Sequence, residues 1–183
     1  VAAVAMESPA DSAGTGLWTA LRDGVSERPD RSERVCIADS KVLHQGHGRL
    51  GRLEHHVLAT SDVPLPCDFG VFASSLGINE DHISRGEPWH HDVFPPVPLE
   101  ADVAAIELSR ETLRAAMNRA GVRLRSVRVN LAQPWRFNAL VAATDNKATA
   151  LWRLSMELLE GLLCRFPGES VLATMDKHGG RAY

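Results

Sequence analysis

The sequence predicts an α/β fold, and three observations support this prediction. Short apolar runs at residues 1–6 and 34–38 have the length and composition of β-strands. Residues 122–131 alternate apolar and polar side chains, which is typical of a strand with one buried face. Between these runs, leucine and alanine recur at helical spacings over residues 109–120 and 146–165. Strands that are separated by helices favour an α/β architecture.

Residues 1–60 are expected to alternate strands and helices. All six side chains at residues 1–6 are apolar, so we predict a strand that is buried on both faces. A short helix is predicted around residues 16–22, and a second strand at 34–38. Apolar residues at helical spacings between residues 48 and 60 predict an amphipathic helix.

The middle of the chain is less regular. Residues 61–98 contain six prolines and are expected to form an irregular insertion with a short helix at 69–76. A helix is then predicted from Ser109, as its N-cap, to the residue before Gly121. Because a chain of 183 residues can bury one substantial core, we expect a single domain over residues 1–183 that includes this insertion.

The last third of the chain contains the clearest patterns. The alternating strand at 122–131 carries three arginines at or near its exposed face. We interpret residues 134–138 as a turn, followed by the long helix at 146–165. The apolar residues at 170–174 then predict a short buried strand.

The composition argues against several classes of protein. A net charge of −3 is not that of a strongly basic, non-specific nucleic-acid binder, although it is compatible with a local basic cleft. No apolar stretch reaches the roughly 20 residues that span a bilayer, so we expect no membrane association. The three cysteines are odd in number and far apart, which favours a reducing, cytoplasmic location over a disulfide-linked scaffold. We expect a monomer.

The most informative short motif is Met-Asp-Lys-His-Gly-Gly-Arg at residues 175–181. Asp176 follows a predicted strand directly, and open α/β sheets bind ligands at the carboxyl ends of their strands. Lys177, His178 and Arg181 would supply positive charge for phosphate groups, and the planar fork of Arg181 matches phosphate oxygens best. Two simpler interpretations stay open: Asp176 caps a turn, and Arg181 pairs with a surface acid after a tight Gly-Gly turn.

Two other polar segments lie at the ends of predicted elements. Asp39, Ser40 and Lys41 follow a strand, where the Ser40 hydroxyl and the Lys41 ammonium group could contact a backbone phosphate. A solvated turn is an equal alternative for this segment. Asn146 and Lys147 begin the long helix, whose first amides could bind a phosphate, although the simpler interpretation makes Asn146 an N-cap.

Two histidine pairs are candidates for metal binding. His55 and His56 are adjacent on a predicted helix, so their side chains point about 100° apart and cannot share a metal ion there. His90 and His91 lie in a proline-rich stretch without the matching Cys or His spacing of a zinc site. We interpret this second pair as solvent-exposed loop residues.

Two segments of the chain keep the order and spacing of a known family. Asp39-Ser40-Lys41-Val42-Leu43 looks like an Asp-Ser-Lys-x-Leu segment that follows a hairpin. The run from Asn146-Lys147-Ala148-Thr149 to Asp176 looks like a long helix that leads to a strand with a catalytic aspartate. Together they resemble the ribonuclease HII family (type 2 ribonuclease H). Ordinary members have Asp-Gly at the last position, and the residues 176–181 of this chain are similar to a divergent bacterial branch.

The resemblance implies a ribonuclease-H-like mixed sheet flanked by helices. It also implies hydrolysis of the RNA strand in RNA–DNA hybrids or ribonucleotide-containing duplexes by two Mg²⁺ or Mn²⁺ ions, with Asp176 as catalytic metal ligand. The family's Asp-Glu pair would lie before Val1 and a further aspartate after Tyr183. We therefore expect an internal fragment, truncated at both ends. We expect it to be inactive alone, because one carboxylate cannot hold two divalent ions.

Two alternative functions stay open. The chain could be a non-catalytic nucleic-acid-binding module on a ribonuclease-H-like scaffold. It could also be an unrelated α/β enzyme in which residues 177–181 form an anion-binding loop. Hybrid-dependent binding of Mg²⁺ that requires Asp176 is expected only for the nuclease.

Overall fold

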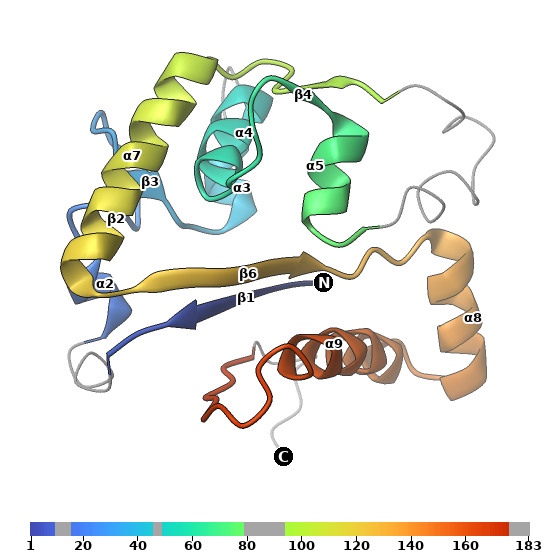
Figure 1. The fold of residues 1–183 in the computed structure, drawn as a ribbon. Coiled ribbons are helices and arrows are strands. Elements are labelled where there is room, and N and C mark those ends of the chain that lie inside the picture. Colours follow the sequence, from blue (N-terminus) through green and yellow to red (C-terminus); the bar gives the residue numbers. More distant parts are fainter. Residues whose placement is uncertain (10–15, 46–48, 79–93, 176–183) are drawn as a thin grey trace. The chain divides into compact units, whose positions relative to one another are not determined.

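The computed structural model of the chain describes residues 1–9, 16–45, 49–78 and 94–175. These residues form seven helices and three two-stranded sheets, which confirms the predicted α/β class (Figure 1). The strands are β1 (Ala2–Glu7), β2 (Val25–Ser26), β3 (Val35–Cys36), β4 (Cys67–Asp68), β5 (Pro96–Val97) and β6 (Arg123–Val129). The helices are α2 (Leu17–Ala20), α3 (Ser40–Leu43), α4 (Arg49–Ala59), α5 (Phe69–Ser75), α7 (Val103–Ala120), α8 (Pro134–Thr144) and α9 (Lys147–Leu163).

Contacts between residues divide the chain into two compact units. Unit 1 comprises Val1–Ala5, Ala73–Val93 and Ser126–Tyr183. Unit 2 comprises Met6–Phe72 and Phe94–Arg125. The expectation of a single domain over residues 1–183 stays a prediction.

β1 and β6 form an antiparallel pair (Figure 1). The Val1 amino group donates a hydrogen bond to the Asn130 carbonyl at 3.1 Å, and the Asn130 N–H donates to the Val1 carbonyl at 2.8 Å. Two residues that exchange both hydrogen bonds in this way are typical of antiparallel strands. Both strands are therefore confirmed. The prediction that β1 is buried on both faces is wrong: its residues alternate between exposed and half-buried, and Val4 is 53% exposed. Successive side chains of a strand point to opposite faces, and only one face of β1 is covered.

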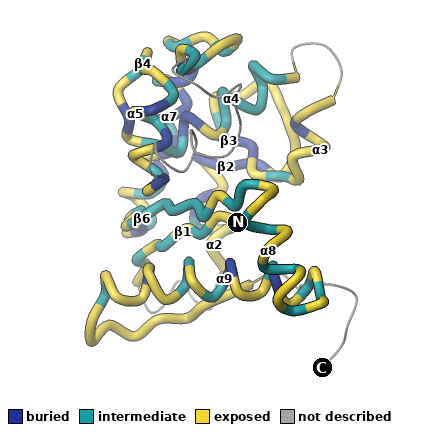
Figure 2. Tube along the Cα trace, turned by 90° about the vertical axis from the view of Figure 1, so that its right-hand side faces the viewer, coloured by how far each residue is buried: buried dark blue, intermediate teal, exposed yellow. Residues whose placement is uncertain are grey.

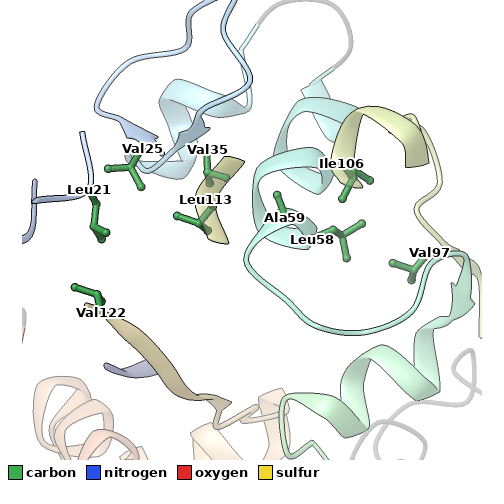
Figure 3. Close-up of a cluster of buried hydrophobic side chains, with 9 residues drawn as sticks. All are labelled: Leu21, Val25, Val35, Leu58, Ala59, Val97, Ile106, Leu113 and Val122. Carbon is green, nitrogen blue, oxygen red and sulfur yellow. The ribbon is translucent and has the colours of Figure 1, made fainter. Parts of the chain in front are cut away.

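Unit 2 is built around a cluster of buried apolar side chains, in which α4 packs against α7 (Figure 3). The cluster consists of Leu21, Val25, Val35, Leu58, Ala59, Val97, Ile106, Leu113 and Val122. Ile106 is fully buried, at 0% exposure. Removing a side chain of this size from water stabilises the fold by about 1.5–3 kcal/mol.

The N-cap of helix α7 lies seven residues before the predicted one, so the interpretation of Ser109 as this cap is wrong. Asp102 is the N-cap, and its carboxylate accepts the Ala105 backbone N–H at 2.8 Å. Ser109 is instead a buried residue inside the helix. The predicted end is confirmed, because Gly121 has a φ of 64° and adopts the left-handed conformation that glycine tolerates best. Asp and Ser are both good N-caps, so residue type alone does not distinguish Asp102 from Ser109.

The proline-rich insertion contains regular structure at both of its ends. The predicted short helix is confirmed as α5. On either side of it, β4 and β5 pair antiparallel, with Cys67 opposite Val97 and Asp68 opposite Pro96. Residues 79–93 lie outside the described residues.

In unit 1, helices α8 and α9 pack against each other. The interpretation of residues 134–138 as a turn is wrong, because Pro134 is the first residue of the 11-residue helix α8. Proline is well suited to this position, where its missing N–H would have no partner in any case. The long helix is confirmed as α9, which has 17 residues.

The predicted strand at 170–174 does not form. Residues 170–175 are exposed and adopt no regular structure, and Leu172 is 89% exposed (Figure 2). A strand needs a neighbour that takes up its backbone hydrogen bonds, and no described residue pairs with this segment. An apolar run predicts the tendency of a segment to become a strand but cannot supply its partner.

Candidate functional site

The Asp39-Ser40-Lys41 segment lies at the start of the one-turn helix α3 in unit 2. Asp39 is the N-cap of this helix, and its carboxylate accepts the Lys41 backbone N–H at 2.8 Å. Ser40 and Lys41 are exposed. Asp39 therefore has a local structural role, while the contact of Ser40 and Lys41 with a phosphate stays a prediction.

Asn146 caps helix α9 in unit 1. Its side-chain oxygen accepts the backbone N–H groups of Ala148 at 2.9 Å and Thr149 at 3.1 Å. This confirms the N-cap interpretation, and it means that the two amides are already engaged. The exposed Lys147 side chain is the remaining feature of this helix start that suits an anion.

Four of the predicted site residues, Asp176, Lys177, His178 and Arg181, lie outside the described residues, as do His90 and His91. Their roles stay predictions. The described motif residues fall into two groups, because Ser40 and Lys41 belong to unit 2 and Asn146 and Lys147 to unit 1.

A hollow of about 350 Å³ opens in unit 1 where β6 ends. Its walls come from the turn after α5, from the end of β6, from α8 and from the second half of α9 with the turn that follows it. Five of its described lining residues have charged or amide side chains: Arg128, Asn130, Arg136, Glu157 and Arg165. We call this site the arginine hollow. Three positive charges and one negative charge give these residues a net charge of +2.

One of the three arginines is held in a network with the single carboxylate. Arg136 donates to the Glu157 carboxylate at 2.6 Å and to the Asn130 side-chain oxygen at 3.0 Å. The Asn130 side-chain NH₂ in turn donates to Glu157 at 3.2 Å and to the Leu154 carbonyl at 3.1 Å. The network ties the end of β6 to α8 and α9, and it leaves the charge of Glu157 neutralised by Arg136.

The other two arginines, Arg128 and Arg165, make no ion pair with any carboxylate that the structure describes. Arg128 lies against the turn at Gly77: a Cβ atom added there would meet Arg128 Nη1 at 2.3 Å. Gly77 also has a φ of +78°, a backbone conformation that favours glycine, and its missing side chain leaves room for the guanidinium group. The turn is fixed to β6 by the Val129 N–H, which donates to the Leu76 carbonyl at 3.0 Å. Arg128 is thus positioned by packing.

The side chains of the arginine hollow suit an anion. Two guanidinium groups without a described carboxylate partner lie in one concave site, and each presents a planar set of donors that matches phosphate or carboxylate oxygens. The sequence did not reveal this site. Arg128, Arg136 and Arg165 come from a strand, a helix and a turn, and no spacing in the sequence links them.

The two histidines of α4 form hydrogen bonds with buried residues of unit 2. His55 Nε2 lies 2.8 Å from the buried Ser109 hydroxyl, and His56 Nδ1 accepts the Cys36 backbone N–H at 3.2 Å. Burial lowers the pKa of His56 to about 4, with smaller contributions from the neighbouring His55 and Arg52. Burial also lowers the pKa of His55. Both rings are therefore neutral at pH 7.

We expect the protein to lose stability as the pH falls from 6.5 to 4.5. In the unfolded chain His56 takes up a proton near pH 6.5, whereas in the folded protein it stays neutral until about pH 4. The contribution of His56 to the free energy of unfolding is therefore fully present above pH 6.5 and is lost progressively as the pH falls below it. Because the ring is half-buried and solvent screens its charge, we expect a loss of about 1–2 kcal/mol. Urea unfolding across this range measures it. His56→Gln should reduce the pH dependence, whereas replacing the exposed His44 by glutamine should leave it intact; equal pH dependence in His56→Gln would contradict the assignment.

No family model, no curated protein and no solved structure matches this chain. Among the described residues, no three His, Cys, Asp or Glu side chains are grouped so that they could hold a metal ion. None of the described helices combines the length and apolar character that a membrane span requires. The interpretation of the site therefore rests on its geometry and on the sequence motifs.

Proposed function

We propose that this chain is the α/β body of a ribonuclease HII-like protein that binds RNA–DNA hybrids or ribonucleotide-containing duplexes and hydrolyses their RNA. The observation that supports this most is helix α9. It begins at the Asn146 cap, where the motif places the start of its long helix, although the strand that the motif places before Asp176 does not form. Asp39-Ser40-Lys41 likewise lies at a capped helix start. A ribonuclease-H-like arrangement of the strands is part of the same proposal.

Asp176 is the proposed ligand for Mg²⁺ or Mn²⁺. Such an ion would polarise the phosphodiester and generate a nucleophile from bound water. The described residues alone do not fit a divalent ion, because they include no group of three suitable side chains. No catalytic step is therefore assigned to them, and their proposed role is to bind the nucleic acid.

The local charge of the arginine hollow supports a phosphate-rich ligand. The arginine hollow has a net charge of +2 although the whole chain carries −3. A concave site with this local excess attracts polyanions and raises their rate of association. Helix α9 contributes to this hollow and also leads to Asp176, so both features belong to one unit.

A second candidate function is a nucleic-acid-binding module without catalysis. The lack of a carboxylate cluster among the described residues favours it. A module of this kind would bind hybrids through phosphate contacts alone, and its affinity would not depend on Mg²⁺.

Metal titration in the presence and absence of a short RNA–DNA hybrid tests the proposed function. We expect calorimetry to detect Mg²⁺ binding only when the hybrid is present, because substrate phosphates complete the coordination of the ion. Asp176→Asn should abolish this binding. The matched control is Asp145→Asn, since Asp145 is exposed and its φ of 48° suits asparagine.

The possible outcomes separate the candidates. Hybrid binding that is unaffected by Mg²⁺ and by Asp176→Asn would identify the non-catalytic module. Failure of the chain to bind the hybrid at all would contradict both candidates. Binding of small phosphorylated compounds without hybrid binding would point instead to an α/β enzyme with an anion-binding loop.

A further inference from the structure

We infer that the arginine hollow is a phosphate-binding site, with Arg128 and Arg165 as the groups that contact the ligand. If the proposed function holds, on which this part of the inference rests, the phosphate belongs to the backbone of the bound nucleic acid. None of the sequence motifs includes this site.

The distribution of charge supports the inference. Arg136 is bound to Glu157 and Asn130, so its charge is already compensated within the hollow. Arg128 and Arg165 have no described carboxylate partner, and they line the same concavity. Two uncompensated guanidinium groups that line one concavity give it a positive potential, which attracts an anion. A phosphate fits best, because each guanidinium can donate two parallel hydrogen bonds to it.

The supporting structure shows why Arg128 is suited to binding. Its guanidinium group packs on the Gly77 turn, where a Cβ atom would lie only 2.3 Å from Nη1. A side chain that is already held in place loses less conformational entropy when it binds a ligand. Arg165 is exposed just beyond the end of α9 and lines the same hollow.

The environment favours an anion over an apolar ligand. Of the twelve described residues that line the hollow, five are arginine, asparagine or glutamate. The exposure of Arg165 shows that the hollow is open to solvent, as contact with the phosphate of a long polymer requires. A phosphorylated small molecule offers the same chemistry, and the experiment distinguishes the two sources.

Titration of the ¹⁵N-labelled chain with inorganic phosphate tests the site directly. We expect saturable shifts of the Gly77 and Val129 amide signals. In the double variant Arg128→Gln/Arg165→Gln, the dissociation constant should rise about tenfold or more, because two charge-assisted contacts are lost. Arg153→Gln is the matched control: Arg153 is exposed on α9 but does not line the hollow. The control should bind phosphate like the wild type.

A variant that is expected to raise the affinity for phosphate, rather than lower it, excludes a purely structural effect. Glu157→Gln removes the only negative charge from the described lining but keeps an oxygen that accepts from Arg136. We expect phosphate to bind about threefold more tightly to this variant. Should the Arg128 variant fail to fold, Arg165→Gln alone provides the test, because Arg165 is exposed.

Fluorescence anisotropy with a labelled RNA–DNA hybrid identifies the source of the phosphate. If it is a backbone phosphate, the double variant should bind the hybrid about tenfold more weakly, and the slope of log affinity against log salt should fall by about 2. Loss of phosphate binding with unchanged hybrid binding would assign the site to a small phosphorylated ligand. Phosphate shifts that are absent in the wild type, or equal in the double variant, would overturn the site itself. Asp176→Asn tests the proposed function independently, because it replaces none of the described residues that line the hollow.

Discussion

Replacing Arg110 by methionine should lower the free energy of unfolding by about 3 kcal/mol. Arg110 is buried on α7, and its Nη2 donates to the carbonyls of Leu58 at 3.1 Å and Val63 at 3.2 Å. Its Nη1 donates to the Glu107 carboxylate at 2.7 Å. Methionine fills a similar volume but donates no hydrogen bond, so the carbonyls of Leu58 and Val63 lose their donor.

Urea unfolding monitored by circular dichroism measures this effect, with Arg114→Met as the matched control. Arg114 lies on the same helix, but its side chain is 56% exposed and its partner Asp62 is 84% exposed. Exposed pairs of this kind contribute about 0–1 kcal/mol. Similar losses for the two variants would show that the hydrogen bonds of Arg110 do not carry the stability assigned to them.

Ile106→Ala should cost about 2–4 kcal/mol of stability. Ile106 is a residue of α7 with 0% exposure, and it lies in the apolar cluster of unit 2 together with Leu58 and Ala59 of α4 (Figure 3). Alanine removes three carbon atoms, and the surrounding helices can close only part of the cavity that they leave. The variant should therefore lose both transfer free energy and packing contacts.

Leu108→Ala provides the comparison on the same helix. Leu108 is 48% exposed, so we expect its replacement to change the free energy of unfolding by less than about 1 kcal/mol. Thermal or urea unfolding of the two variants under identical conditions gives the difference. If Leu108→Ala were the more damaging change, the buried face of α7 would be the opposite one.

Most helices could be predicted from the sequence because their signals are local. The apolar stripe of α9, the cap at Asn146 and the stop at Gly121 all act within one or two turns of the chain. The alternation that predicts β6 is equally local. Where two residues can perform the same local task, the pattern does not decide between them: Ser109 and Asp102 both suit an N-cap, and the structure uses Asp102.

The candidate functional residues also divide into those with a local sequence signal and those that only packing brings together. Asp39 and Asn146 were recognised as motif residues, and the structure shows that both cap helices. The arginine hollow could not be predicted, because Arg128, Arg136 and Arg165 are brought together only by the packing of β6, α8 and α9. The strand predicted at 170–174 was wrong for a related reason, since pairing depends on a distant partner.

By itself, the sequence determined the α/β class, the positions of most helices and the presence of β1 and β6. These features follow from propensity, capping and periodicity, which depend on neighbouring residues. Only the tertiary structure decided that His55 and His56 are neutral groups of the core and that three arginines share one hollow. Burial and charge compensation depend on residues far apart in the chain, and neither can be deduced before those residues are brought into contact.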